Sequence, residues 1–128
     1  MVKYKYLNLN PKGIREEDCV TRAITFASGL PYKEIYEKLW LTARIFNCDR
    51  LCKFCYSNFI NYVLKYKEVN CDNLTIRQFA EKHPYGTYLI RINGHFNGHL
   101  TCIRDSVLYD IWDCRDELCD TVWKADDI

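Results

Sequence analysis

The sequence predicts an α+β fold, in which N-terminal helices pack on a C-terminal antiparallel sheet. Two observations carry this prediction. Apolar residues repeat with helical spacing from residue 16 to residue 83, and the spacing changes to the alternation of a strand from Tyr85 onward. This segregation along the chain is typical of an α+β domain, not of a doubly wound one. Because no repeat or Pro/Gly/Ser-rich linker interrupts the 128 residues, residues 1–128 are expected to form a single domain.

Four helices are expected before the sheet. The first has an apolar stripe that begins at Cys19, and Gly29 ends it. The second starts after Pro31, which suits a first helical turn. The fourth opens with a capping box formed by Thr75 and Gln78. The third would bury one continuous stripe: Cys52, Cys55, Phe59, Val63 and Tyr66. The expected bounds are residues 16–28, 32–46, 51–66 and 75–83.

Five strands are expected. Residues 2–7 alternate lysines with aliphatic or aromatic residues, which predicts an edge strand whose lysines face water. A loop follows at Asn10, Pro11 and Gly13. The later strands are separated by hairpin-like breaks at residues 93–98 and 105–106. Their expected bounds are residues 87–92, 99–104, 107–113 and 119–124.

Composition excludes several classes of protein. Residues 54–64 form an apolar run without a charged residue, but it is only 11 residues long and contains Ser and Asn, so it is too short and too polar to span a bilayer. With 18 Lys and Arg against 17 Asp and Glu, and no dense basic stripe, the sequence gives no support for nucleic-acid binding. The chain opens without a signal peptide, so a reducing cytoplasm, of a bacterium or a phage-infected host, is expected. The eight cysteines are then expected to be thiols, not disulfides.

Cys19 is the candidate nucleophile among these thiols. A free thiol is mostly protonated at neutral pH, and a helix N-terminus or a nearby imidazole lowers its pKa. Cys19 lies where the first helix begins, but the acidic run at residues 16–18 opposes a thiolate, so an ionising partner is required. Two histidines, His95 and His99, flank a Gly-rich turn. We favour His99 as the general base, because the start of a strand fixes the direction of a ring better than a turn does.

A third group must fix the imidazole tautomer and stabilise its charged form. The expected turn at residues 105–106 returns the next strand alongside and brings Asp110 close to the level of His99. Asp113 points to the opposite face of the strand from Asp110, so only one of the two can serve. The register favours Asp110.

The three candidates thus occur in a fixed order along the chain: a cysteine on an early helix, a histidine on a later strand and an aspartate on the next strand. The runs that carry them are DCVTRAI at residues 18–24, GHLTCI at 98–103 and YDIWD at 109–113. With this order the chain resembles the small papain-like cysteine peptidases of bacteria and bacteriophages. The resemblance implies a papain-like fold, with Cys19 as nucleophile, His99 as general base and acid, and Asp110 as the residue that orients His99.

The resemblance assigns two further residues. The pair Asp110-x-Trp112 is similar to the Asn-x-Trp of the papain group, in which the tryptophan shields the hydrogen bond of the histidine from water. Papain-like enzymes also place a Gln before the nucleophile as an oxyanion-hole donor, and residues 13–18 contain none. Asn10 is the nearest amide side chain and is the candidate substitute, joined by the backbone N–H of Cys19. The implied function is a thiol hydrolase that cleaves a peptide, isopeptide or related amide bond in a peptide or protein substrate, without a metal or organic cofactor.

Two other functions stay open. One is a non-catalytic binding protein that keeps the papain-like fold and docks a partner protein. The other is a zinc module in which Cys71 joins the thiols of a Cys-x3-Cys-x2-Cys run at Cys48, Cys52 and Cys55. The same run has the cluster-binding spacing of radical-SAM enzymes, but their barrel needs a longer chain. The spacing also fits one buried helix face, and we expect these thiols to pack there.

Overall fold

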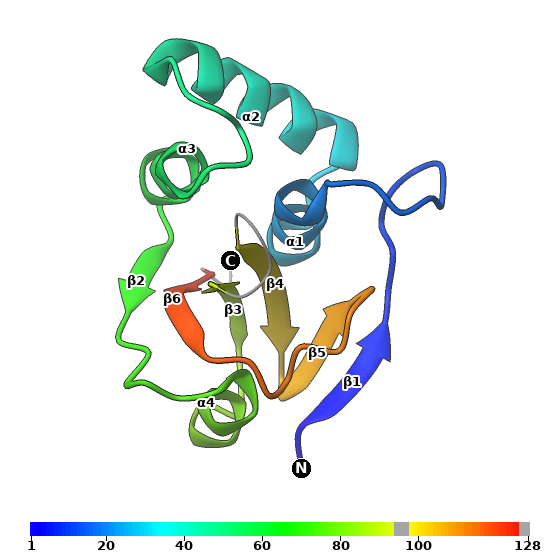
Figure 1. The fold of residues 1–128 in the computed structure, drawn as a ribbon, viewed down its shortest axis with the longest axis vertical. Coiled ribbons are helices and arrows are strands. Elements are labelled where there is room, and N and C mark those ends of the chain that lie inside the picture. Colours follow the sequence, from blue (N-terminus) through cyan, green and yellow to red (C-terminus); the bar gives the residue numbers. More distant parts are fainter. Residues whose placement is uncertain (94–97, 126–128) are drawn as a thin grey trace.

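The structure, a computed structural model of the chain, describes residues 1–93 and 98–125. Within those residues four α-helices, one π-helical segment and a six-stranded mixed sheet form an α+β fold (Figure 1). The strand order in the sheet is β1-β5-β4-β3-β6-β2. In chain order the elements are β1 (Lys3–Tyr6), α1 (Cys19–Ser28), α2 (Tyr32–Phe46), α3 (Lys53–Asn58), the π-helix η1 (Phe59–Leu64), β2 (Lys67–Val69), α4 (Ile76–Lys82), β3 (Thr87–Ile92), β4 (His99–Arg104), β5 (Val107–Asp110) and β6 (Cys119–Lys124).

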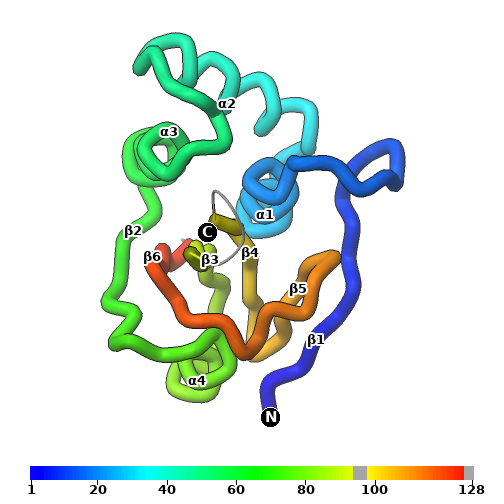
Figure 2. Tube along the Cα trace, viewed as in Figure 1, coloured from blue at the N-terminus to red at the C-terminus, as the bar shows by residue number. Residues whose placement is uncertain are grey.

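Helices cover both faces of the sheet (Figures 1 and 2). The helices α1, α2 and α3 lie on one side and α4 lies on the other. Alternating side chains of β3 divide the interior accordingly: Leu89 belongs to the core under α1, whereas Tyr88 and Ile90 pack in the core that contains Phe79 of α4. The candidate nucleophile, Cys19, packs against the first of these cores.

The expectation of a purely antiparallel sheet is wrong at one edge. β2, β3, β4, β5 and β6 pair antiparallel, but β1 runs parallel to β5, with Tyr6 opposite Asp110. No short turn joins these two strands, so nothing local in residues 2–7 specifies the direction of pairing. The pairing bears on the site, because the N–H of Leu7 and the hydroxyl of Tyr4 both donate to the carbonyl of Asp110, each at 3.0 Å.

The first two helices follow the apolar pattern closely. α2 has both predicted bounds, and α1 ends at Gly29, whose φ of 73° is left-handed, as predicted for the stop residue. α1 starts later than expected, at Cys19. Asp18 occupies its N-cap position but makes no capping hydrogen bond, because its carboxylate accepts from the Arg22 Nε at 2.7 Å. Cys19 therefore lies in the first turn of α1.

The third predicted helix, residues 51–66, is divided. α3 continues into the π-helix η1, whose wider turn displaces the side chains that follow. Phe59 stays buried, but Val63 is 51% exposed, so the predicted stripe is wrong at Val63. The short exposed strand β2 follows and was not predicted, since three residues at a sheet edge carry no apolar alternation.

The later elements match the sequence better. β3, β4 and β6 have their predicted bounds, and the capping box of α4 is confirmed by hydrogen bonds in both directions between Thr75 and Gln78. β5 ends at Asp110 and not at residue 113. It ends there because the N–H of Ile111 donates to the carboxylate of Asp110 at 2.6 Å, and the chain bends.

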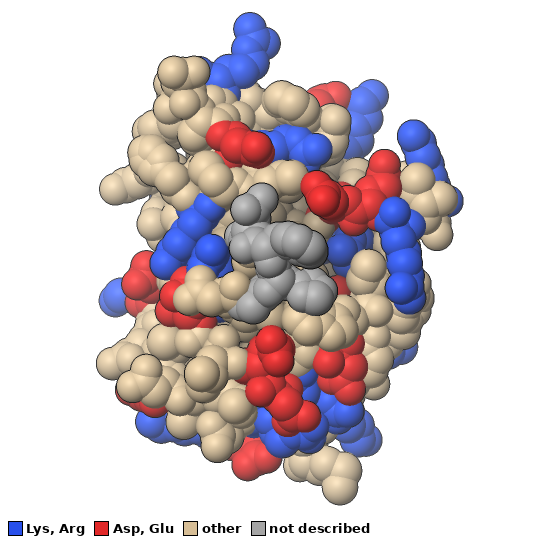
Figure 3. Space-filling model, viewed as in Figure 1, with Lys and Arg blue, Asp and Glu red and all other residues tan. Residues whose placement is uncertain are grey.

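The surface carries both signs of charge. On the face shown in Figure 3, acidic and basic side chains are interspersed among the residues that are coloured. In the described part of the chain, no helix combines the length and the apolarity that a membrane crossing needs.

Candidate active site

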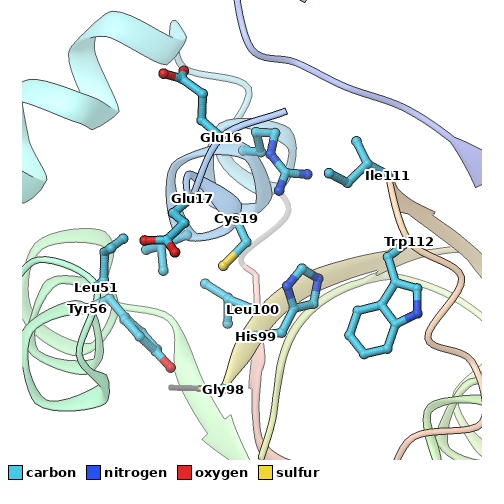
Figure 4. A pocket seen from close by; sticks show the side chains of 12 residues that line it. Glu16, Glu17, Cys19, Leu51, Tyr56, Gly98, His99, Leu100, Ile111 and Trp112 are labelled. Carbon is cyan, nitrogen blue, oxygen red and sulfur yellow. The ribbon is translucent and has the colours of Figure 1, made fainter. Parts of the chain in front are cut away.

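Cys19 is the first residue of α1, and its half-buried side chain lines a cavity. The N–H groups in the first turn of a helix lack intrahelical partners, so partial positive charge surrounds the sulfur. Figure 4 shows the Sγ of Cys19 pointing toward the ring of His99. The helix start thus directs the thiol at the imidazole.

His99 is the first residue of β4, where it pairs with Ile92 of β3. Its Nε2 lies 2.6 Å from the Oδ2 of Asp110, and its side chain is 11% exposed. Because Nε2 faces Asp110, Nδ1 is the nitrogen that remains for the hydrogen bond with Cys19. The ring is therefore held between a carboxylate and a thiol. The alternative base, His95, lies outside the described residues.

Asp110 is the last residue of β5 and is 3% exposed. One carboxylate oxygen faces His99, and the other accepts from the Nη1 of Arg22 at 3.3 Å. Asp113, the other aspartate considered, pairs instead with Arg115, whose Nη2 lies 2.7 Å from its Oδ2. The structure brings Asp110, and not Asp113, to His99.

These side chains shift each other's pKa toward the charged forms. Burial alone would lower the pKa of His99, but its bonds with Asp110 and Cys19 raise it to about 9. Burial would raise the pKa of Cys19, yet the hydrogen bond and charge of His99, the N–H of Leu100 and the charge of Arg22 lower it below its ordinary value. Burial would likewise raise the pKa of Asp110, and His99 lowers it. All three shifts therefore act in the direction of a thiolate on Cys19, an imidazolium on His99 and a carboxylate on Asp110.

A cavity of about 300 Å³ opens beside this line of side chains (Figure 4). Leu51 and Tyr56 line it opposite His99, and the carboxylates of Glu16 and Glu17 also line it. Trp112 packs edge-on to the imidazole, with 5.2 Å between the ring centroids, on the other side of the ring from Cys19. The cavity thus gives a substrate access to the sulfur, while an aromatic ring covers the imidazole.

The structure does not bring Asn10 to this cavity. Its side chain is buried, and its Nδ2 donates to the Oδ2 of Asp18 at 2.9 Å and to a carboxylate oxygen of Glu16. Two carboxylates thus take up the two amide hydrogens, and Asn10 braces the loop before α1. The other expected oxyanion donor, the backbone N–H of Cys19, belongs to the first residue of α1.

The sequence analysis missed Arg22, which is 7% exposed although it is charged. Its Nε donates to the Oδ1 of Asp18 at 2.7 Å and its Nη1 reaches Asp110. A signal was present, because Arg22 follows Asp18 by four residues and Cys19 by three, which places all three on one side of the helix start. An arginine at that spacing beside an apolar stripe is a candidate for a buried ion pair.

The thiols of the alternative zinc site are not gathered at one point. Cys48 and Cys55 hydrogen-bond with each other, but the Sγ of Cys71 donates to the carbonyl of Asp120 at 3.5 Å. Among the described residues, one group of three His, Cys, Asp or Glu side chains has its ligand atoms within 4.8 Å of one another. That group is His99, Asp110 and Cys114. The four-cysteine arrangement is therefore not assembled in the described part of the chain.

No family model matches the chain, and no curated protein or solved structure matches it either. Its function is therefore argued from the geometry of the site. The residues that this geometry brings together are Cys19, Arg22, His99, Asp110 and Trp112.

Proposed function

We propose that this chain is a thiol hydrolase of the papain-like kind, which cleaves a peptide, isopeptide or related amide bond through an acyl-enzyme intermediate. The observation that carries the proposal is that Cys19 and His99 line one cavity and that the buried Asp110 lies behind His99, with 2.6 Å between His99 and Asp110. The order of elements supports the papain-like kind: a helix begins with the cysteine, and successive strands carry the histidine and the aspartate.

Acylation uses the charged pair. The thiolate of Cys19 attacks the carbonyl carbon of the substrate, and the C–S bond forms as the carbonyl oxygen becomes an oxyanion. The N–H at the start of α1 stabilises that oxyanion. The imidazolium of His99 then gives its Nδ1 proton to the leaving nitrogen, and the C–N bond breaks. An amine leaves, and a thioester of Cys19 remains next to a neutral imidazole.

Deacylation reverses these roles. Neutral His99 takes a proton from water as the oxygen of that water attacks the thioester carbon. The C–S bond breaks, a carboxylic acid leaves, and Cys19 is again a thiolate beside the imidazolium of His99. Asp110 keeps Nε2 protonated and stabilises the positive charge in both half-reactions.

Two small probes test the proposal. Iodoacetamide at pH 6, followed by peptide mapping, should alkylate Cys19 at least about tenfold faster than the other seven thiols, because His99 lowers the pKa of Cys19. p-Nitrophenyl acetate should give a burst of about one p-nitrophenolate per chain, with the acetyl group on Cys19, and then steady turnover.

Matched variants give the contrast. Cys19→Ala should abolish both the burst and the turnover, whereas Cys71→Ala, which removes another half-buried thiol, should leave them unchanged. Uniform slow alkylation, or acetylation spread over several thiols, would contradict the proposal. That outcome would favour the alternative, a non-catalytic binding protein that uses the same cavity.

A further inference from the structure

The guanidinium of Arg22 lies buried between two carboxylates of different origin. Asp18 precedes α1, and Asp110 ends β5, so the bonds of 2.7 Å and 3.3 Å join the helix start to the sheet. A charge taken out of water is costly unless its partners are well placed, and removal of one partner leaves a buried charge uncompensated. Burial of the Arg22 guanidinium is therefore favourable only while both carboxylates, Asp18 and Asp110, are in contact with it.

Asp18 is itself held from the far side. Its Oδ2 accepts from the hydroxyl of Tyr32 on α2 at 2.8 Å and from the Nδ2 of Asn10 at 2.9 Å, and it is 4% exposed. These bonds fix the carboxylate that holds the Nε of Arg22. A chain of buried polar contacts thus runs from α2 through Asp18 and Arg22 to Asp110, and from there to His99.

We propose that Arg22 is a positioning residue, which holds the carboxylate of Asp110 in place so that Asp110 can hold His99 as the charged partner of Cys19. The proposal rests on the site described under the proposed function but not on its substrate. Arg22 also lines the cavity, but no step of the mechanism gives it a contact with the reacting carbonyl.

The contacts of Asp110 explain why a cation is needed beside its carboxylate: it fixes the orientation of the carboxylate and compensates its buried charge. Its Oδ2 faces His99, and its Oδ1 accepts from the N–H of Ile111 and from Arg22, so both oxygens are engaged and the carboxylate cannot rotate. A planar guanidinium reaches two carboxylates in fixed directions, which a lysine ammonium cannot do. Loss of Arg22 would free one side of Asp110 and leave its buried charge with less compensation.

Several other titratable groups face this cluster and must be kept constant in any test. They are Asp18 before α1, Tyr32 of α2, Tyr56 of α3, Tyr4 of β1 and Cys114, together with Glu16 and Glu17 at the cavity. Substitution of Arg22 keeps all of these side chains, but it removes the cation that faces Asp18.

The test is the pH dependence of the iodoacetamide reaction at Cys19, measured by peptide mapping on the full chain. Arg22→Gln should move the midpoint of the profile upward by about one pH unit, which is about a tenfold lower rate at pH 6. The effect should shrink in an Asp110→Asn background, because Arg22 then has no carboxylate to position. If Arg22→Gln does not fold, Arg22→Lys carries the same test with a smaller displacement.

Arg104→Gln is the matched control. Arg104 also ties α1 to the sheet, through the Thr87 hydroxyl at 2.9 Å and the carbonyl of Phe26 at 3.1 Å, but it does not bond to Asp110. In Arg104→Gln the pH midpoint of the iodoacetamide reaction at Cys19 should stay at the wild-type value. An unmoved midpoint in folded Arg22→Gln, or an equal displacement in the Asp110→Asn background, would overturn the proposal. Alkylation needs no turnover, so absence of hydrolysis with a displaced midpoint would reject the hydrolase and leave the role of Arg22 standing.

Discussion

Replacement of Asp110 by Asn removes the charge that His99 responds to and keeps the shape of the side chain. In the folded protein the pKa of His99 is about 9, against an ordinary 6.5. At about 1.4 kcal/mol per pH unit, this difference favours the charged ring by about 3 kcal/mol. Asp110 and Cys19 share that contribution, and burial opposes it. Since an opposite charge at close range shifts a pKa by roughly one to three pH units, we expect Asp110→Asn to lower the pKa of His99 by that amount.

Proton NMR of the histidine rings measures this pKa directly. The chain has three histidines, so a His99→Gln spectrum identifies the resonance. Asp113→Asn is the matched control, because it removes a nearby carboxylate that pairs with Arg115 and not with His99. We expect a lower midpoint in Asp110→Asn and no change in the control. A midpoint that stays near 9 in Asp110→Asn would refute the conclusion that Asp110 sets the charge of the ring.

The same substitution predicts a pH-dependent loss of stability. The raised pKa of His99 in the folded state contributes stability that is fully present below pH 6.5 and is lost as the pH rises through about 9. Asp110→Asn should therefore lower the free energy of unfolding in urea more at pH 6 than at pH 10. An equal loss at both values would assign the effect to the unpaired Arg22 alone.

Three other measurements test separate features. The rate of hydrolysis should fall above about pH 9, because His99 then loses the proton that it gives to the leaving nitrogen. The rate of alkylation of Cys19 should not fall there, because the thiolate persists. If both rates fell together, the roles assigned to His99 and Cys19 would be contradicted. Trp112→Ala should lower the pKa of His99 in the NMR titration, since water then competes for the bond to Asp110, and an unchanged midpoint would show that the tryptophan does not shield it. Thr75→Ala should lower the free energy of unfolding by about 1 kcal/mol in urea without a change in alkylation, because it removes one half of a capping box; a change in alkylation would mean that α4 influences the site.

Elements with a local signal were predictable from the sequence. The bounds of α2 follow from Pro31 and a regular apolar spacing, and β3 and β4 follow from alternation on either side of a Gly-rich break. The contact between His99 and Asp110 was also predictable, because strand alternation and a tight turn specify which side chains share a face.

Features that depend on distant partners were not predictable. The parallel pairing of β1 with β5 joins strands that lie far apart in the sequence, and the register of such a pair is decided by packing. The π-helix likewise gives no apolar signature of its own, so Val63 was placed on the wrong face. Asn10 was assigned by its proximity in sequence to Cys19, but two carboxylates compete for its amide. For β1 the deciding contacts come from a strand far along the chain, whereas the two carboxylates that bind Asn10 lie in the acidic run just before α1.

The reactivity expected of Cys19 has the same origin, since it depends on partners and not on exposure. Burial raises the pKa of Cys102 and Cys119 to about 12, which leaves a thiolate fraction of about 10⁻⁵ at neutral pH. Burial acts on Cys19 too, but His99 outweighs it. Cys48, Cys52 and Cys71 are half-buried as Cys19 is, so exposure alone would rank the four thiols alike. Faster alkylation of Cys19 than of those three would therefore measure the contribution of its imidazole, which contacts Asp110 of β5 and is linked through Arg22 and Asp18 to α2.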